Sequence, residues 1–286
     1  MIHILDIISK IGIVPVIALD HAKDAEPLAN ALCKGSLPIA EVTFRTDAAE
    51  ESIRIMTTKF PDMLVGAGTV LTTEQADKAI LAGAKFIVSP GCNPRIIKYC
   101  QSKEIDIIPG CSSASDIEQA LECGLDTVKF FPAEDAGGIK MIKALSAPYH
   151  SVKFLPTGGI NANNLNSYLS LKKVIACGGS WMVNKEDIRM GEFEKITSMA
   201  KQAVQTMLDF QIKSVGNLLS KNMLSDIFAG EDGTILLKTS SIVRAVFHLE
   251  RQGFSFDMDS AEYDASKELL SICFQSTDGT KVRLVC

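Results

Sequence analysis

The first two hundred residues of the chain repeat one unit eight times, and this repeat restricts the fold more than any other feature. In each unit a short apolar run ends in glycine, proline or a polar residue, and an amphipathic segment follows. Near-continuous apolar runs are typical of parallel strands buried on both faces. The runs occupy residues 13–19, 38–44, 63–68, 85–91, 105–110, 126–131, 152–159 and 173–179. Eight alternations of strand and helix predict an α/β fold, a (β/α)8 TIM barrel.

The segments between the runs carry the start and stop signals of helices. Thr72 or Thr73 can cap one helix, and an acidic residue follows in its first turn. Gly35 and Gly124 stand where two other helices would end. A doubly wound open sheet is the alternative, and we disfavour it because no GxGxxG turn follows the first run.

The pattern changes after a long helical segment at residues 192–210. Beyond it lie strand-like runs, one helix-like segment and two Asp-Gly pairs, Asp232-Gly233 and Asp278-Gly279, which are typical of hairpin turns. We therefore predict two domains, a barrel over residues 1–210 and a small α+β appendage over residues 211–286.

Composition narrows the class of partner. The net charge of -5 gives no reason to expect nucleic acid or an anionic membrane. No apolar run reaches the roughly 18 residues that cross a bilayer, and we interpret the apolar segment at residues 11–19 as a core strand, not a signal peptide. Eight scattered cysteines without a CxxC pair indicate reduced thiols and a cytoplasmic protein. Four histidines without metal-ligand spacing give no support to a metal site.

Polar side chains gather at the ends of the predicted strands, and in a TIM barrel the carboxyl ends of the strands form the active site. Alternation along a strand puts Glu41, Thr43 and Arg45 on one face. Lys129 shares a face with Phe131. A carboxylate, a guanidinium and a lysine would then face one another across the barrel mouth. Taken singly, Lys129 could be a solvated strand residue, and Glu41 with Arg45 a plain ion pair.

Glycine pairs end the seventh and eighth runs, at residues 158–159 and 178–179, and Ser180 follows the second pair. The loops after these two strands are the usual phosphate site of the fold, because their backbone N–H groups face an anion. The alternative is that both pairs only form tight turns.

Six motifs follow one another over residues 1–208: EVTFRT, VGAGTVL, SPG, VKFFPAE, PTGGI and GGSWMV. Together they resemble the 2-keto-3-deoxy-6-phosphogluconate (KDPG) aldolase family, also called 4-hydroxy-2-oxoglutarate (KHG) aldolase. The resemblance implies a homotrimeric class I aldolase that uses a Schiff-base lysine and needs no metal or other cofactor. Its partner would be a small keto acid.

The resemblance also implies a role for each matching residue. Lys129 of VKFFPAE would be the Schiff-base residue, and Glu41 of EVTFRT the acid/base. Arg45 and Thr69 would hold the pyruvyl end of the substrate. The other residues that we assign to substrate binding are Pro90, Phe131, Thr157, Gly158, Gly159, Gly179 and Ser180, the last five of them lining the pocket and its phosphate end.

The chemistry explains why such residues are needed. Breaking a carbon–carbon bond beside a ketone leaves an electron pair on carbon, and an iminium formed by a neutral lysine accepts that pair. An apolar setting and a nearby cation disfavour the ammonium form. We expect cleavage of KDPG to pyruvate and glyceraldehyde 3-phosphate, as in the Entner–Doudoroff pathway, and/or of KHG to pyruvate and glyoxylate. The alternatives are a phosphate-binding barrel isomerase and a non-catalytic sugar-acid sensor.

The stretch TSSIVRAVFHLERQGFSFDMDSAEYDA resembles part of a glyoxalase-type (vicinal oxygen chelate) βαβββ module. Such modules normally pair, and residues 211–286 supply only one. His248 and Glu250 lie two positions apart on a predicted helix, so they fall on different faces and we do not expect them to share a metal. Subunit pairing and ligand-linked regulation both remain open for this appendage.

Overall fold

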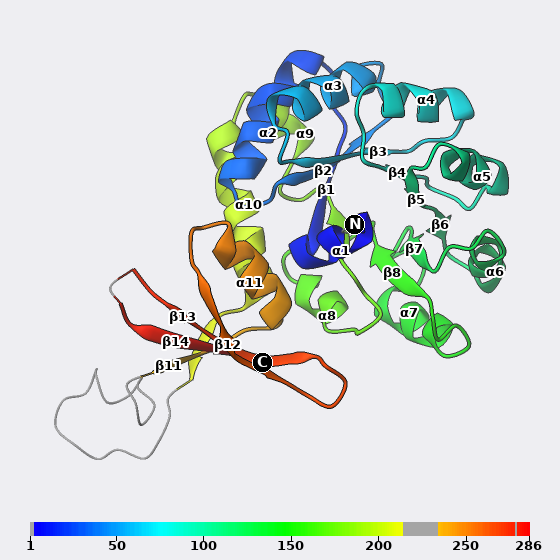
Figure 1. The fold of residues 1–286 in the computed structure, drawn as a ribbon. Helices are drawn as coiled ribbons and strands as arrows, with labels where there is room; N and C mark the ends of the chain where they lie inside the picture. Colours follow the sequence, from blue (N-terminus) through cyan, green and yellow to red (C-terminus); the bar gives the residue numbers. More distant parts are fainter. Residues whose placement is uncertain (1–2, 214–233, 278) are drawn as a thin grey trace. The chain divides into compact units, whose positions relative to one another are not determined.

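The computed structural model describes residues 3–213, 234–277 and 279–286. The chain divides into two compact units, Met1–Val204 and Gln205–Cys286. Figure 1 shows the first unit as a ring of strands surrounded by helices, and the second as a sheet with a helix packed on it.

The strands of the first unit form a closed parallel barrel. They are β1 (Ile13–Ile17), β2 (Ile39–Thr43), β3 (Leu64–Gly68), β4 (Phe86–Val88), β5 (Asp106–Ile108), β6 (Gly110–Cys111), β7 (Thr127–Phe130), β8 (Lys153–Pro156) and β9 (Cys177–Gly179). Six of them pair in the order β5-β4-β3-β2-β1-β9, and the other three in the order β6-β7-β8. Each of the eight predicted runs contains a strand, and the TIM-barrel prediction is confirmed.

Two links join the two sheets. The fifth run is divided at Pro109 into β5 and β6, and the Lys129 N–H of β7 donates to the Pro109 carbonyl at 2.8 Å. On the other side, a parallel bridge pairs Thr157 with Gly178. The ring therefore has eight strand positions, with β5 and β6 sharing one of them.

Helices follow the strands and surround the ring, except the first helix, which precedes β1 and is drawn over the middle of the ring (Figure 1). They are α1 (Ile4–Ile11), η1 (Ala22–Asp24), α2 (Ala25–Lys34), α3 (Ala49–Lys59), α4 (Thr73–Leu81), α5 (Pro94–Ser102), α6 (Ala114–Glu122), α7 (Gly138–Ser146), α8 (Leu165–Leu169), α9 (Lys185–Arg189) and α10 (Phe193–Leu208). Thr72 is the N-cap of α4, where its side chain accepts from the Gln75 N–H. A reciprocal capping box of Ser113 and Asp116 begins α6.

Both faces of the barrel strands are packed, as continuous apolar runs predict. All five residues of β2 are buried, Glu41 and Thr43 among them. On β3, Gly66 leaves room for the ring of Phe86, since a Cβ there would lie 2.4 Å from that ring. Burying a side chain such as Phe86 stabilises the fold by about 1.5–3 kcal/mol, and the tight fit beside Gly66 makes this part of the core intolerant of added volume.

Among its described residues, the second unit has a mixed sheet and one complete helix, and the predicted small α+β domain is confirmed. Its strands pair in the order β10 (Gln211–Lys213), β11 (Ile235–Lys238), β14 (Lys281–Val285), β13 (Leu269–Gln275) and β12 (Phe256–Tyr263). The pairing of β11 with β14 is parallel, and the other pairings are antiparallel.

The helix of the second unit, α11 (Ile242–Glu250), buries His248 and exposes Glu250. The predicted turn at Asp232-Gly233 lies outside the described residues, as does Asp278 of the second predicted turn. The strands on either side of that second turn, β13 and β14, form an antiparallel pair.

No helix among the described residues has both the length and the apolar character of a membrane span. No group of three or more histidine, cysteine, aspartate or glutamate side chains in the same residues is arranged to hold a metal ion.

Candidate active site

The side chain of Lys129 points into the barrel. Its residue on β7 is 5% exposed, and Nζ lies 3.0 Å from Oε1 and 3.4 Å from Oε2 of Glu41, which is 1% exposed. These two residues are 88 positions apart in sequence and meet because β2 and β7 lie in the same ring. A solvated lysine on the outside of the barrel is therefore ruled out. Taking two charges out of water is tolerated only because each neutralises the other.

Gly68 creates the space that Glu41 occupies. The register of β2 and β3 places Gly68 opposite Thr43, one pleat beyond Glu41. A Cβ added to Gly68 would lie 2.3 Å from Glu41 Oε1 and 2.7 Å from its Cγ. Since real Cβ contacts are not that short, any side chain at this position must displace the carboxylate from Lys129.

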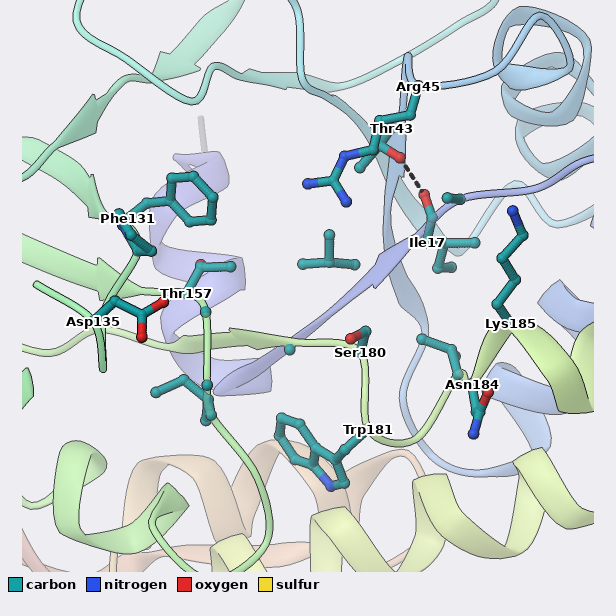
Figure 2. Close-up of a pocket in the computed structure, with 18 residues that line it drawn as sticks. Ile17, Thr43, Arg45, Phe131, Asp135, Thr157, Ser180, Trp181, Asn184 and Lys185 are labelled. Atoms are coloured by element: carbon teal, nitrogen blue, oxygen red, sulfur yellow. Dashed lines mark hydrogen bonds between the residues drawn. The ribbon is translucent and has the colours of Figure 1, made fainter.

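A cavity of about 710 Å³ opens at the carboxyl ends of the strands (Figure 2). Thr43 and Phe131 line it. Thr43 lies two residues after Glu41, and Phe131 lies two residues after Lys129. Neither Glu41 nor Lys129 is among the lining residues. Because residues two apart share a face, we place the lysine–glutamate pair one pleat deeper, below the base of this cavity. The Lys129 Nζ is 5.4 Å from the centroid of the Phe131 ring, which covers it from the cavity side.

Seven predicted substrate-binding residues line the cavity: Arg45, Phe131, Thr157, Gly158, Gly159, Gly179 and Ser180. Figure 2 shows the Arg45 guanidinium and the Ser180 hydroxyl turned toward its interior. Within the part of the chain that the structure describes, Arg45 has no acidic partner. An unpaired guanidinium at the mouth of a cavity is suited to a carboxylate, which it can bind through two parallel hydrogen bonds.

The Thr157 hydroxyl is a second unused polar group. It is buried, and among the described residues its Oγ1 has no hydrogen-bond partner. Gly178 presses against it from β9, since a Cβ there would lie 2.3 Å from Oγ1. Leaving a buried hydroxyl unpaired costs about 1–3 kcal/mol, and a ligand atom in the cavity would relieve that cost.

The loop after β8 is held in a conformation that requires glycine. Gly158 and Gly159 have φ of 101° and 79°, in the left-handed region where other residues are strained. The loop is tied to the segment after β7, because the Ala133 N–H donates to the Thr157 carbonyl and the Glu134 N–H to the Gly158 carbonyl. The wall beside Phe131 is therefore fixed by backbone hydrogen bonds.

Two predicted residues stand apart from this cavity. Thr69 follows β3 with a left-handed φ of 55° and is not among the cavity-lining residues. Pro90 lines a separate hollow of about 190 Å³. Its carbonyl packs against Gly110, where a Cβ would come within 2.1 Å of it. The structure thus brings Glu41, Lys129 and seven lining residues together but leaves Thr69 and Pro90 outside the main cavity.

Other lining residues were not predicted from the sequence. They include Asp135, Trp181 and Lys185. The ring of Trp181 lies over Gly179, whose missing side chain leaves room for it. Lys185 pairs with Asp20 at 2.9 Å, and its hydrogen bond holds the pKa of that exposed carboxyl below the ordinary value. Trp181 and Asp135 each stand inside or next to a quoted motif, which is the only signal that could have singled them out.

The chain is thus a TIM barrel with a buried lysine–glutamate pair near the carboxyl ends of its strands, where enzymes of this fold have their active sites. Comparisons with known proteins identify the family. The family model for KDPG and KHG aldolase matches residues 4–199. The chain is 49% identical over 205 residues to the 2-dehydro-3-deoxy-phosphogluconate aldolase of Treponema pallidum, with 72% of this chain and 98% of the relative covered. It is 47% identical to the enzyme of the same name from Haemophilus influenzae, with 71% of this chain and 95% of that enzyme covered. The chain therefore belongs to the KDPG and KHG aldolase family, and it is an aldolase, a carbon–carbon lyase.

Solved structures of KDPG aldolases are also similar to this chain. The KDPG aldolase of Legionella pneumophila, with pyruvate captured as a covalent carbinolamine intermediate, matches with a TM-score of 0.68 and 40% identity, over 70% of this chain and 98% of that one. The KDPG aldolase of Zymomonas mobilis with 3-phosphoglycerate matches with a TM-score of 0.65 and 38% identity, over 70% of this chain and 94% of that one.

Proposed function

We propose that this chain is a class I aldolase that forms a Schiff base at Lys129. Its reaction is the reversible cleavage of KDPG to pyruvate and glyceraldehyde 3-phosphate, and/or of KHG to pyruvate and glyoxylate. One observation carries the assignment: a buried amine and a buried carboxylate lie 3.0 Å apart below the base of a cavity that holds an unpaired guanidinium. The covalent pyruvate intermediate in the Legionella relative supports the same chemistry.

The first half of the reaction uses the contact between Lys129 and Glu41. Glu41 takes a proton from the ammonium across 3.0 Å, and the neutral amine attacks the keto carbon of the substrate to form a carbinolamine. Loss of water then gives an iminium. The positive nitrogen is the electron acceptor that carbon–carbon cleavage requires.

The second half is proton transfer at two substrate atoms. A carboxylate accepts the proton of the hydroxyl on the carbon that becomes the aldehyde. That C–O bond becomes the aldehyde C=O as the carbon–carbon bonding pair moves into the iminium to give an enamine. The same group then returns a proton to the enamine carbon, and water releases pyruvate and the free lysine. Glu41 is the carboxylate that lies closest to Lys129, so we assign both transfers to it, directly or through a water.

Different walls of the cavity bind different parts of the substrate. Arg45 binds the carboxylate of the pyruvyl part. Backbone N–H groups of the Gly158-Gly159 loop and the Ser180 hydroxyl face the far end, which is a phosphate in KDPG and a carboxylate in KHG. Thr157 donates its unpaired hydroxyl to the substrate between these ends. Thr69 and Pro90 stay predicted binding residues, although neither lines the main cavity.

Several finer assignments belong to the same proposal. We propose a cytoplasmic homotrimer that acts in the Entner–Doudoroff pathway, on the basis of the family resemblance and of eight cysteines that are all free thiols. We also propose that residues 211–286 are a separate domain related to a glyoxalase-type half module, since β11, α11, β12, β13 and β14 follow in the order βαβββ. A chain truncated after Phe210 tests the second point, and loss of folding of the barrel would contradict it.

Pyruvate release tests the function as a whole. The full chain, supplied separately with KDPG and KHG, should release pyruvate from at least one of them, and Lys129→Met should release none. The Lys59→Met variant is a matched control, because Lys59 is a surface lysine at the end of α3. Wild-type turnover by Lys129→Met would exclude Schiff-base chemistry, and tight binding without turnover by the wild type would favour the sensor.

A further inference from the structure

Asp135 is a carboxylate in the cavity that the reaction above does not use. It follows the VKFFPAE motif and lines the cavity with Thr157 and Gly158. Figure 2 shows its carboxylate turned toward the cavity interior. Among the described residues it has no hydrogen bond and no basic partner. It is not a helix cap either, since the N-cap position of α7 is Gly137.

The charges in the cavity are separated. Besides Asp135, the charged lining residues are Arg45 on the β2 side and Lys185 on the β9 side. Figure 2 shows these side chains entering from different elements, with Asp135 opposite Arg45. Lys185 is already paired with Asp20, whereas Asp135 and Arg45 are unpaired within the described ranges. An anionic substrate therefore meets a cation at one wall and a carboxylate at another.

A free carboxylate accepts hydrogen bonds and repels anions. It cannot bind the phosphate or the second carboxylate of a substrate, so its partner in an anionic keto acid is a hydroxyl. The two candidate substrates differ here. KDPG carries one hydroxyl more than KHG, on the carbon beside its phosphate-bearing end, whereas KHG has a carboxylate at the corresponding place.

We propose that Asp135 is a specificity-determining residue, which accepts a hydrogen bond from a hydroxyl of the aldehyde half and so selects a polyhydroxylated keto acid over a short dicarboxylate. The inference rests on the proposed function and narrows its substrate class. Of the groups that we assign to the terminal anion, the Ser180 hydroxyl lies on a different wall of the cavity from Asp135 (Figure 2). Repulsion by Asp135 acts against a carboxylate placed where the hydroxyl belongs.

The test compares kcat/KM for KDPG and KHG in wild type, Asp135→Ala and Asp135→Asn. A hydrogen bond to a charged group is stronger than one between neutral groups, and the solvent exposure of Asp135 weakens it. We expect Asp135→Ala to lower kcat/KM for KDPG about tenfold and to leave or raise that for KHG. Asp135→Asn keeps an acceptor oxygen without the charge. Its kcat/KM for KDPG should therefore lie between those of Asp135→Ala and wild type, while its kcat/KM for KHG should equal that of Asp135→Ala.

The matched control is Asp62→Asn. It removes the same charge from an exposed position just before β3, at the amino ends of the barrel strands and away from the cavity, and should leave the KDPG-to-KHG ratio unchanged. An equal ratio in wild type and Asp135→Ala, or a higher KDPG rate in Asp135→Ala, would overturn the inference. Borohydride trapping of pyruvate on the same samples separates the two proposals, because a covalent adduct in both proteins with an unchanged ratio means that only the role of Asp135 is wrong.

Discussion

Gly68 offers the sharpest structural prediction, because the three atoms nearest to an added methyl group all belong to Glu41 of the proposed catalytic pair. In Gly68→Ala the new Cβ would lie 2.3 Å from Glu41 Oε1, 2.7 Å from Cγ and 2.8 Å from Cδ. An ordinary contact is at least about 3.4 Å. The carboxylate must therefore shift by about 1 Å, and its hydrogen bond of 3.0 Å to Lys129 is lost or lengthened.

The size of the effect follows from two magnitudes. Overpacking of a closed core site costs about 1–3 kcal/mol of stability, against which an alanine in a strand returns about 0.4–1 kcal/mol through the unfolded chain. We expect a net loss of about 1–2 kcal/mol in the free energy of unfolding. Misplacing a catalytic group by about 1 Å lowers the rate about 100-fold. The mutation should therefore reduce kcat/KM far more than it reduces stability.

Urea unfolding and pyruvate release measure the two quantities on the same protein. Gly91→Ala is the matched control, since no atom lies within 4 Å of a Cβ at that position, and it should keep wild-type kcat/KM and stability. Wild-type kcat/KM in Gly68→Ala would refute the reasoning, because it would show that the position of Glu41 does not matter for turnover.

Three further predictions concern single side chains. Glu41→Gln should lower kcat/KM by about 10²–10⁴, the usual effect of losing acid/base catalysis, while pyruvate consumption in the reverse reaction falls in parallel. Thr157→Val should leave the urea midpoint unchanged or raise it, because the hydroxyl is unpaired in the free protein, yet lower kcat/KM about tenfold; a lower midpoint with normal turnover would contradict this. Lys185→Met should raise the pKa of Asp20 toward 3.8 in an NMR titration, since the hydrogen bond from Lys185 is the main cause of its lowered value. The folded-state pKa of Asp20 is depressed, so this pair stabilises the fold above the ordinary aspartate pKa and its contribution is lost as pH falls through the lowered pKa.

The barrel could be predicted because hydrophobic periodicity is a local signal. Each apolar run became a strand, and strand alternation placed Lys129 and Glu41 on the inside. The lengths of the individual strands were less predictable. The fifth run is divided at Pro109, which has no N–H to donate, and β9 keeps only Cys177–Gly179 of the run at 173–179.

The loops account for what the sequence did not show. Asp135 and Lys185 lie in loops, outside the periodic pattern of apolar residues. Their place in the cavity depends on how the segments after β7 and β9 turn. Thr69 stays a prediction: it has a left-handed φ of 55° and directly follows Gly68, the neighbour of Glu41, but it is not among the residues that line the main cavity. Backbone turns of this kind are set by contacts between loops that no spacing rule describes.

The central claim is that the Lys129 amine captures a keto group, and covalent trapping tests it most directly. The full chain is incubated with pyruvate and sodium borohydride, digested, and mapped by mass spectrometry. We expect one reduced pyruvyl adduct, on the peptide that carries Lys129, and none in Lys129→Met. An unmodified Lys129, or an adduct on another lysine that persists in Lys129→Met, would contradict the mechanism.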